Sequence, residues 1–139
     1  MKFGIIIQAR TGSTRFPGKV LKKISGNKSV LNFQIERLLQ VFNNKQIFIA
    51  TTKLKSDKKI CNLASKFKIK FFCGSKNDLL KRYLDCAKKY RVKNIVRITS
   101  DCPLVDPYLI KEMIKTFFKR KIDYIANTLP ISRSTYPDG

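Results

Sequence analysis

One stretch near the start of the chain decides its fold: FGIIIQARTGSTRFPGK, at residues 3–19. Its first five residues are a short apolar run, which predicts a buried strand over residues 3–7. The run leads directly into a polar loop that contains two glycines and three cations. A strand that ends in such a loop is typical of the first unit of an α/β fold.

The rest of the chain alternates between strand-like and helix-like segments. Short runs rich in β-branched and aromatic residues predict strands over residues 46–51, 69–73, 94–99 and 122–127. Apolar residues at helical spacing predict helices over residues 31–42, 60–67, 79–90 and 107–117. Ser56 and Asp106 are predicted as N-caps of the second and fourth helices.

This alternation predicts one α/β domain in which helices cover both faces of a mostly parallel sheet. A length of 139 residues suits a single domain. In such sheets ligands bind beyond the carboxyl ends of the strands. We therefore expect the chemistry in two loops, at residues 8–20 and 100–106.

The first of these loops has the composition of a phosphate-binding loop. Glycine lets backbone N–H groups approach an anion closely, and Arg10, Arg15 and Lys19 supply positive charge. Five residues separate Gly12 from Gly18, and Val20 follows the lysine, so the loop is not a Walker A motif. An ordinary basic surface loop is the alternative, because Lys and Arg are common throughout this chain.

The chain is strongly basic, with 30 Lys and Arg against 9 Asp and Glu and a net charge of +21. A nucleic-acid or other anionic partner would account for this charge. The basic residues are nevertheless dispersed in clusters of two or three, which indicates solvated helix surfaces instead. We therefore do not expect a nucleic-acid partner, although the charge would attract a polyphosphate substrate.

The four cysteines form no C-x-x-C pair and the chain has no histidine, so a zinc site is not expected. The absence of histidine also excludes the Ser-His and Cys-His nucleophile pairs. Reduced thiols favour a cytoplasmic location. No apolar run is long enough to predict a membrane-spanning helix.

The order of the motifs resembles the cytidylyltransferase family, which includes the acylneuraminate and 3-deoxy-manno-octulosonate cytidylyltransferases. The likeness begins with IIQARTGSTRFPGKVL at residues 6–21 and is closest to the branch of the spore coat polysaccharide biosynthesis protein SpsF. It continues, in the expected order, through residues 50–52, 74–83, 97–104, 127–128 and 136–139.

The resemblance implies a Rossmann-like, three-layer nucleotidyltransferase fold, truncated at the C-terminus, with residues 1–139 as its nucleotide-binding part. It implies transfer of CMP from CTP to a sugar or sugar acid, with release of pyrophosphate, for surface polysaccharide biosynthesis. It assigns nucleotide binding to Ala9, Arg10, Gly12, Ser13, Arg15, Lys19 and Arg82. It assigns catalysis to Arg10, Lys19 and Asp101, and binding of the Mg²⁺ cofactor to Asp101.

The residues themselves leave alternatives open at two of these positions. Asp101 follows a predicted strand, where a single carboxylate suits Mg²⁺ that is also bound by phosphates and water. A turn-capping Asp before Pro103 is the other interpretation. Asp78 and Arg82 are four residues apart on a predicted helix, so a simple salt bridge competes with a nucleotide contact for Arg82.

Members of the resembled family continue well beyond this length, through the acceptor site, the dimer contacts and often a second metal-binding acid. Asp138 is a candidate for that acid. The longer protein is therefore expected to form a homodimer. Two other hypotheses stay open: a basic nucleic-acid-binding α/β module, and a nucleotide-binding fragment without catalytic activity.

Overall fold

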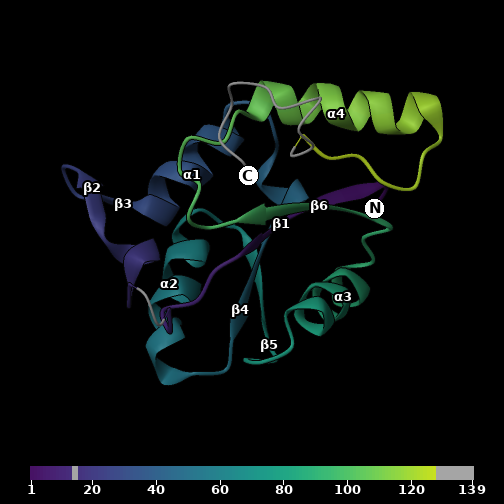
Figure 1. Cartoon of the computed structure of the whole chain (residues 1–139). Coiled ribbons are helices and arrows are strands. Elements are labelled where there is room, and N and C mark those ends of the chain that lie inside the picture. The colour runs from purple at the N-terminus through teal and green to yellow at the C-terminus, as the bar shows by residue number, and fades with distance from the viewer. Residues whose placement is uncertain (14–15, 128–139) are drawn as a thin grey trace.

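The computed structural model describes residues 1–13 and 16–127, which form a three-layer α/β domain (Figure 1). The central strands are β1 (Phe3–Gln8), β4 (Ile47–Thr52), β5 (Lys70–Gly74) and β6 (Asn94–Thr99). The helices are α1 (Val30–Leu39), α2 (Lys58–Lys66), α3 (Leu79–Tyr90) and α4 (Pro107–Arg120). Smaller elements connect them: a hairpin of β2 (Lys23–Ser25) and β3 (Lys28–Ser29), and three short 3-10 turns, η1 (Lys19–Leu21), η2 (Asn44–Gln46) and η3 (Lys55–Asp57).

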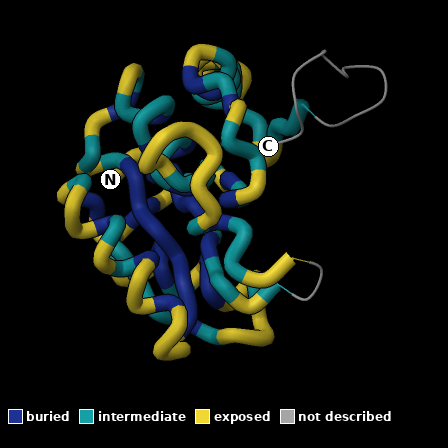
Figure 2. Tube along the Cα trace, turned by 90° about the vertical axis from the view of Figure 1, so that its left-hand side faces the viewer, coloured by how far each residue is buried: buried dark blue, intermediate teal, exposed yellow. Residues whose placement is uncertain are grey.

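The four central strands are parallel and lie in the order β5-β4-β1-β6. Ile5 and Ile7 face a core shared with α1, α2 and α4, whereas Ile6 faces α3 on the opposite side. All three isoleucines are completely buried, and each burial contributes roughly 1.5–3 kcal/mol. Figure 2 shows the resulting pattern, a buried centre enclosed by half-buried and exposed segments. The predicted parallel sheet with helices on both faces is confirmed.

The strand order reverses beside β1. From β1 the chain moves outward to β4 and then to β5, and afterwards it returns to place β6 on the other side of β1. The strand order therefore reverses between β1 and β6, and the loops that leave these two neighbouring strands meet at their carboxyl ends, where a cavity opens. Open α/β sheets bind ligands at such a switch point.

Of the two N-caps that the sequence predicts, one is confirmed and one is wrong. The Asp106 carboxylate accepts hydrogen bonds from the backbone of Tyr108 and Leu109, as expected of an N-cap. Ser56, by contrast, does not cap α2. It lies in η3, one residue before the cap position of Asp57, and its hydroxyl lies 2.8 Å from that of Thr11. The prediction for Ser56 was wrong because a tertiary partner engages its side chain.

The strand predicted at residues 122–127 is also absent. Lys121 adopts a left-handed conformation (φ 52°) that ends α4, and residues 122–127 then continue without strand pairing. A hollow of about 500 Å³ lies between β6, α4 and this segment, so β6 has no strand neighbour on that side within the described residues. Strand-like composition alone does not form a strand, because β-propensity depends on packing against neighbouring residues. In the described part of the chain, no helix is long and apolar enough to cross a membrane.

Candidate functional site

A cavity of about 220 Å³ opens at the switch point between β1 and β6. It is formed by the two loops in which the sequence predicts the chemistry, those after β1 and after β6. Its lining residues are Gln8, Arg10, Ser13, Lys19, Val20, Thr99, Ser100 and Asp101. Four of the predicted site residues, Arg10, Ser13, Lys19 and Asp101, thus lie around one space although the chain separates the first from the last by about ninety positions.

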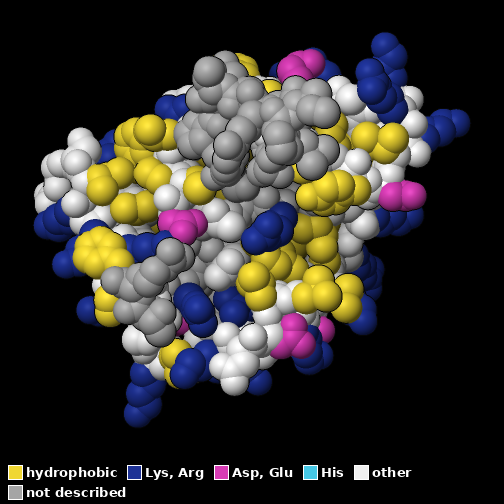
Figure 3. Space-filling model, viewed as in Figure 1, with side chains coloured by type: hydrophobic (Ala, Val, Ile, Leu, Met, Phe, Trp, Pro, Cys, Tyr) yellow, Lys and Arg dark blue, Asp and Glu magenta, His cyan; other side chains and the backbone are white. Residues whose placement is uncertain are grey.

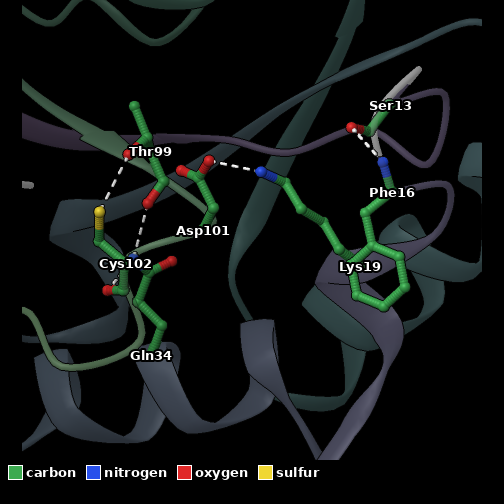
Figure 4. A network of polar contacts seen from close by, with 7 residues as sticks. All are labelled: Ser13, Phe16, Lys19, Gln34, Thr99, Asp101 and Cys102. Carbon is green, nitrogen blue, oxygen red and sulfur yellow. Dashed lines mark hydrogen bonds and ion pairs between the residues drawn. The ribbon is translucent and has the colours of Figure 1, made fainter.

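Lys19 and Asp101 join the two sides of this cavity. The Lys19 Nζ lies 2.5 Å from the Asp101 Oδ2, and both side chains stay partly exposed, at 30% and 45% (Figure 4). The hydrogen bond from Lys19 lowers the pKa of Asp101 below its usual value, against the effect of partial burial. Asp101 is therefore ionised at neutral pH. Exposed pairs of this kind are worth only about 0–1 kcal/mol, so a ligand can readily replace either partner.

Thr11 closes the loop that carries the cations. Its carbonyl oxygen accepts hydrogen bonds from the backbone N–H groups of Ser13 (2.9 Å) and Gly18 (2.8 Å). Gly18 has a left-handed conformation (φ 69°), which glycine adopts without strain, and places Lys19 at the start of η1. Gly12 differs, since its φ is not positive and, apart from its chain neighbours, no described residue has an atom within 4 Å of where a Cβ would be. Its backbone faces open space.

A buried carboxylate that sequence reasoning missed lies below this loop. Asp57 has no exposed surface, and its two oxygens accept hydrogen bonds from Thr11 and Thr52. Burial would raise the pKa of Asp57, but these hydrogen bonds outweigh it and hold the pKa below the ordinary value. The available signal was its position, because Asp57 follows β4 at the same edge of the sheet as the two predicted loops.

Gln34 is a second residue that the sequence did not single out. It is completely buried on α1, and its Nε2 donates to the carbonyl oxygens of Thr99 (2.8 Å) and Cys102 (2.9 Å) (Figure 4). These two carbonyls flank Asp101. Gln34 therefore holds the loop after β6 in place from the helix side.

Arg82 is not part of the cavity lining. It is 1% exposed, and it donates to the carbonyl oxygens of Ser75 (2.8 Å) and Lys76 (3.2 Å). Burial, followed by the charge of Arg10, lowers the pKa of Arg82. The salt bridge with Asp78 is not formed, because the Asp78 carboxylate caps α3 through the Lys81 N–H. Arg82 thus fixes the loop after β5, and its contact with a nucleotide stays a prediction.

The remaining predicted residues have varied positions. Ala9 is buried and continues the pairing of β1 with β4 through a hydrogen bond from its N–H to the Ala50 carbonyl. Arg15 and Asp138 lie outside the described residues. Among the residues that are described, no three His, Cys, Asp or Glu side chains gather into a metal-binding cluster.

Basic side chains are dispersed over the part of the described surface that Figure 3 shows. In Figure 3 the Lys and Arg side chains occupy many separate positions on the visible face, with acidic and hydrophobic groups between them. This face presents no continuous basic stripe of the kind that follows a nucleic-acid backbone. The arrangement agrees with the dispersed charge in the sequence.

Comparison with known proteins places this site in context. Residues 4–135 match the family model described as cytidylyltransferase. The chain is 36% identical to the spore coat polysaccharide biosynthesis protein SpsF of Bacillus subtilis, over 86% of this chain and 51% of that protein. It is 31% identical to the 3-deoxy-manno-octulosonate cytidylyltransferase of Blochmanniella floridana, over 84% of this chain and 47% of that protein.

A solved structure agrees with these sequence matches. The structure of a cytidylyltransferase from Leptospira borgpetersenii superposes with a TM-score of 0.82 and 42% identity, covering 87% of this chain and 50% of that chain. The chain therefore spans about half the length of the curated relatives and the solved structure that it matches.

Proposed function

This chain belongs to the cytidylyltransferase family, and we propose that it provides the nucleotide-binding part of an enzyme that uses CTP. The enzyme transfers CMP from CTP to an oxygen of a sugar or sugar acid and releases pyrophosphate, in surface polysaccharide biosynthesis. The likeness to SpsF and to a 3-deoxy-manno-octulosonate cytidylyltransferase supports this acceptor class.

The observation that carries the proposal is the pairing of Lys19 with Asp101 across the crevice between β1 and β6. It brings a cation from a glycine-bearing loop together with an ionised carboxylate, at the position where α/β folds bind nucleotides. A triphosphate needs a cation such as Lys19, and a divalent cation needs a carboxylate such as Asp101. Here the charges of Lys19 and Asp101 neutralise each other.

Asp101 fits a site for Mg²⁺. Its carboxylate is ionised, partly exposed and open to a cavity large enough for phosphate and water ligands, and Mg²⁺ commonly takes one or two carboxylates together with such ligands. When bound, Mg²⁺ supplies a positive charge that offsets the charge of the phosphate oxygens. Asp101 would hold the ion after Lys19 moves to the triphosphate.

The basic residues of the cavity act on the leaving group. Phosphoryl-type transfer depends mainly on positioning and on stabilisation of charge. Arg10 and Lys19 line the cavity and would bind the two phosphates that leave as pyrophosphate, while an acceptor oxygen attacks the α-phosphate from the opposite side. Losing one such preorganised donor costs roughly 2.7–4 kcal/mol of barrier by analogy with oxyanion donors.

Two measurements test the proposal. Calorimetric titration with CTP, ATP, GTP and UTP in the presence of Mg²⁺ should show selective binding of CTP. A pyrophosphate-release assay with CTP and 3-deoxy-manno-octulosonate then tests turnover. Binding of CTP without pyrophosphate release would identify a nucleotide-binding fragment without activity. No binding of CTP, together with RNA binding that weakens steeply with salt, would refute the proposal and favour the nucleic-acid module.

A further inference from the structure

The buried Asp57 connects the phosphate-binding loop to the central sheet. Its Oδ1 accepts from the N–H (2.8 Å) and the hydroxyl (2.6 Å) of Thr11. Its Oδ2 accepts from the N–H (3.3 Å) and the hydroxyl (2.5 Å) of Thr52. Thr11 belongs to the loop and is half-buried, whereas Thr52 ends β4 and is 1% exposed. One carboxylate thus links the loop after β1 to the end of a central strand through hydrogen bonds.

A carboxylate in this position is costly unless its oxygens are satisfied. Removing an ionised group from water is unfavourable, and it is tolerated only when hydrogen bonds or opposite charges replace the hydration. Asp57 obtains two donors for each oxygen. Any displacement of Thr11 would remove both donors of Oδ1 at once, so the carboxylate opposes movement of the loop at this point.

Thr11 transmits this restraint to the rest of the loop. Its carbonyl holds the N–H groups of Ser13 and Gly18, so both ends of residues 11–18 meet at Thr11. The two described cations of the loop, Arg10 and Lys19, flank this closed turn and line the cavity. Thr11 therefore links the backbone beside Arg10 to the backbone beside Lys19.

We propose that Asp57 is the positioning residue of the phosphate-binding loop, which it holds in its binding shape before the ligand arrives. The inference rests on the proposed function and specifies how that site is organised. Asp57 itself is completely buried beneath the loop and does not line the cavity. Preorganisation of this kind increases affinity because the ligand does not have to order the loop.

The two threonines offer a matched pair of variants. Thr11→Val and Thr52→Val each remove one hydroxyl donor from the same carboxylate and keep the backbone donor and the side-chain shape. Each also removes one other hydrogen bond of that hydroxyl, to Ser56 in the first case and from the Leu54 N–H in the second. If Asp57 positions the loop, Thr11→Val weakens binding of CTP with Mg²⁺ by about fivefold or more, whereas Thr52→Val changes it by less than about twofold. Thr11→Ser restores the hydroxyl and should recover the wild-type affinity.

Hydrogen exchange provides a readout that does not depend on nucleotide. The amides of Ser13 and Gly18 should exchange faster in Thr11→Val than in Thr52→Val, at matched thermal stability. Equal exchange and equal affinity in the two variants would show that Asp57 only stabilises the fold, and would overturn the inference. If the wild-type protein bound no CTP, the proposed function would fail, but hydrogen exchange at the loop would still decide the role of Asp57.

Discussion

Lys19→Met separates the functional and structural contributions of the Lys19–Asp101 pair. The ion pair is short, but its side chains are 30% and 45% exposed, so its loss should change the free energy of unfolding by at most about 1 kcal/mol. A charge-assisted hydrogen bond from lysine to phosphate is worth about 1.5–3 kcal/mol. The dissociation constant for CTP with Mg²⁺ should therefore rise roughly 10- to 150-fold.

The same substitution should have the opposite effect on a metal ion alone. Without nucleotide, Lys19 occupies one oxygen of the Asp101 carboxylate, and its removal leaves that oxygen available. Binding of Mn²⁺ as a paramagnetic substitute for Mg²⁺, followed by electron paramagnetic resonance, should therefore become tighter in Lys19→Met than in the wild-type protein.

Lys28→Met is the matched control. Lys28 forms an ion pair of similar length with Glu36, 2.6 Å, between side chains that are 52% and 34% exposed, and neither residue lines the cavity. Removing this lysine lowers the net charge by the same amount. If Lys28→Met and Lys19→Met weakened CTP equally, the effect would be one of overall charge, and the assignment of Lys19 to the site would be refuted.

Three further predictions concern residues that support the loops of the site. Gly18→Ala should lower the free energy of unfolding by about 1–2 kcal/mol, because φ is positive there. Gly12→Ala should change it by less than about 0.5 kcal/mol. Chemical denaturation measures both values, and equal losses would contradict the argument from backbone strain at Gly18. Gln34→Leu removes the side-chain donor of two partly buried carbonyls, of which that of Cys102 keeps the Val105 N–H. It should therefore destabilise the fold by about 1–3 kcal/mol and weaken binding of Mn²⁺ at Asp101. Unchanged Mn²⁺ affinity would mean that Gln34 does not position that carboxylate. Because the folded state lowers the pKa of Asp57, this residue stabilises the fold at pH values above its ordinary pKa of 3.8, and the contribution is lost as pH falls through the lower pKa of the folded state. The denaturation midpoint of Asp57→Asn should therefore depend less on pH in this acid range than that of the wild-type protein. Parallel pH profiles of the two proteins would contradict the ionised state of Asp57.

The sequence predicted most elements of the fold because burial leaves a periodic pattern in it. The isoleucine run of β1 and the helical spacing in α3 both appear at the expected residues. Prediction failed where an outcome depended on a partner elsewhere in the chain. Residues 122–127 have strand-like composition but no strand pairing in the structure, and Ser56 contacts Thr11 instead of capping α2.

The candidate site likewise contains residues that the sequence predicted and residues that only the structure identified. Arg10, Ser13, Lys19 and Asp101 were found from motif and position because their residue types suit phosphate and metal. Gln34 was missed because nothing in its local sequence indicates what it holds, and Asp57 offered only its position after a strand. Each acts on a backbone or side chain that is distant along the chain, and that relation exists only after folding.

By itself, the sequence determined that a strand leads into a cationic, glycine-bearing loop within an alternating α/β chain, and its ordered motifs resembled the cytidylyltransferases. Local patterns suffice for this because side-chain polarity and glycine content act over a few residues. The tertiary structure alone decided that β6 lies beside β1, that Lys19 reaches Asp101, and that a buried carboxylate anchors Thr11. Strand order places these groups together, and strand order depends on packing between segments that no local pattern specifies.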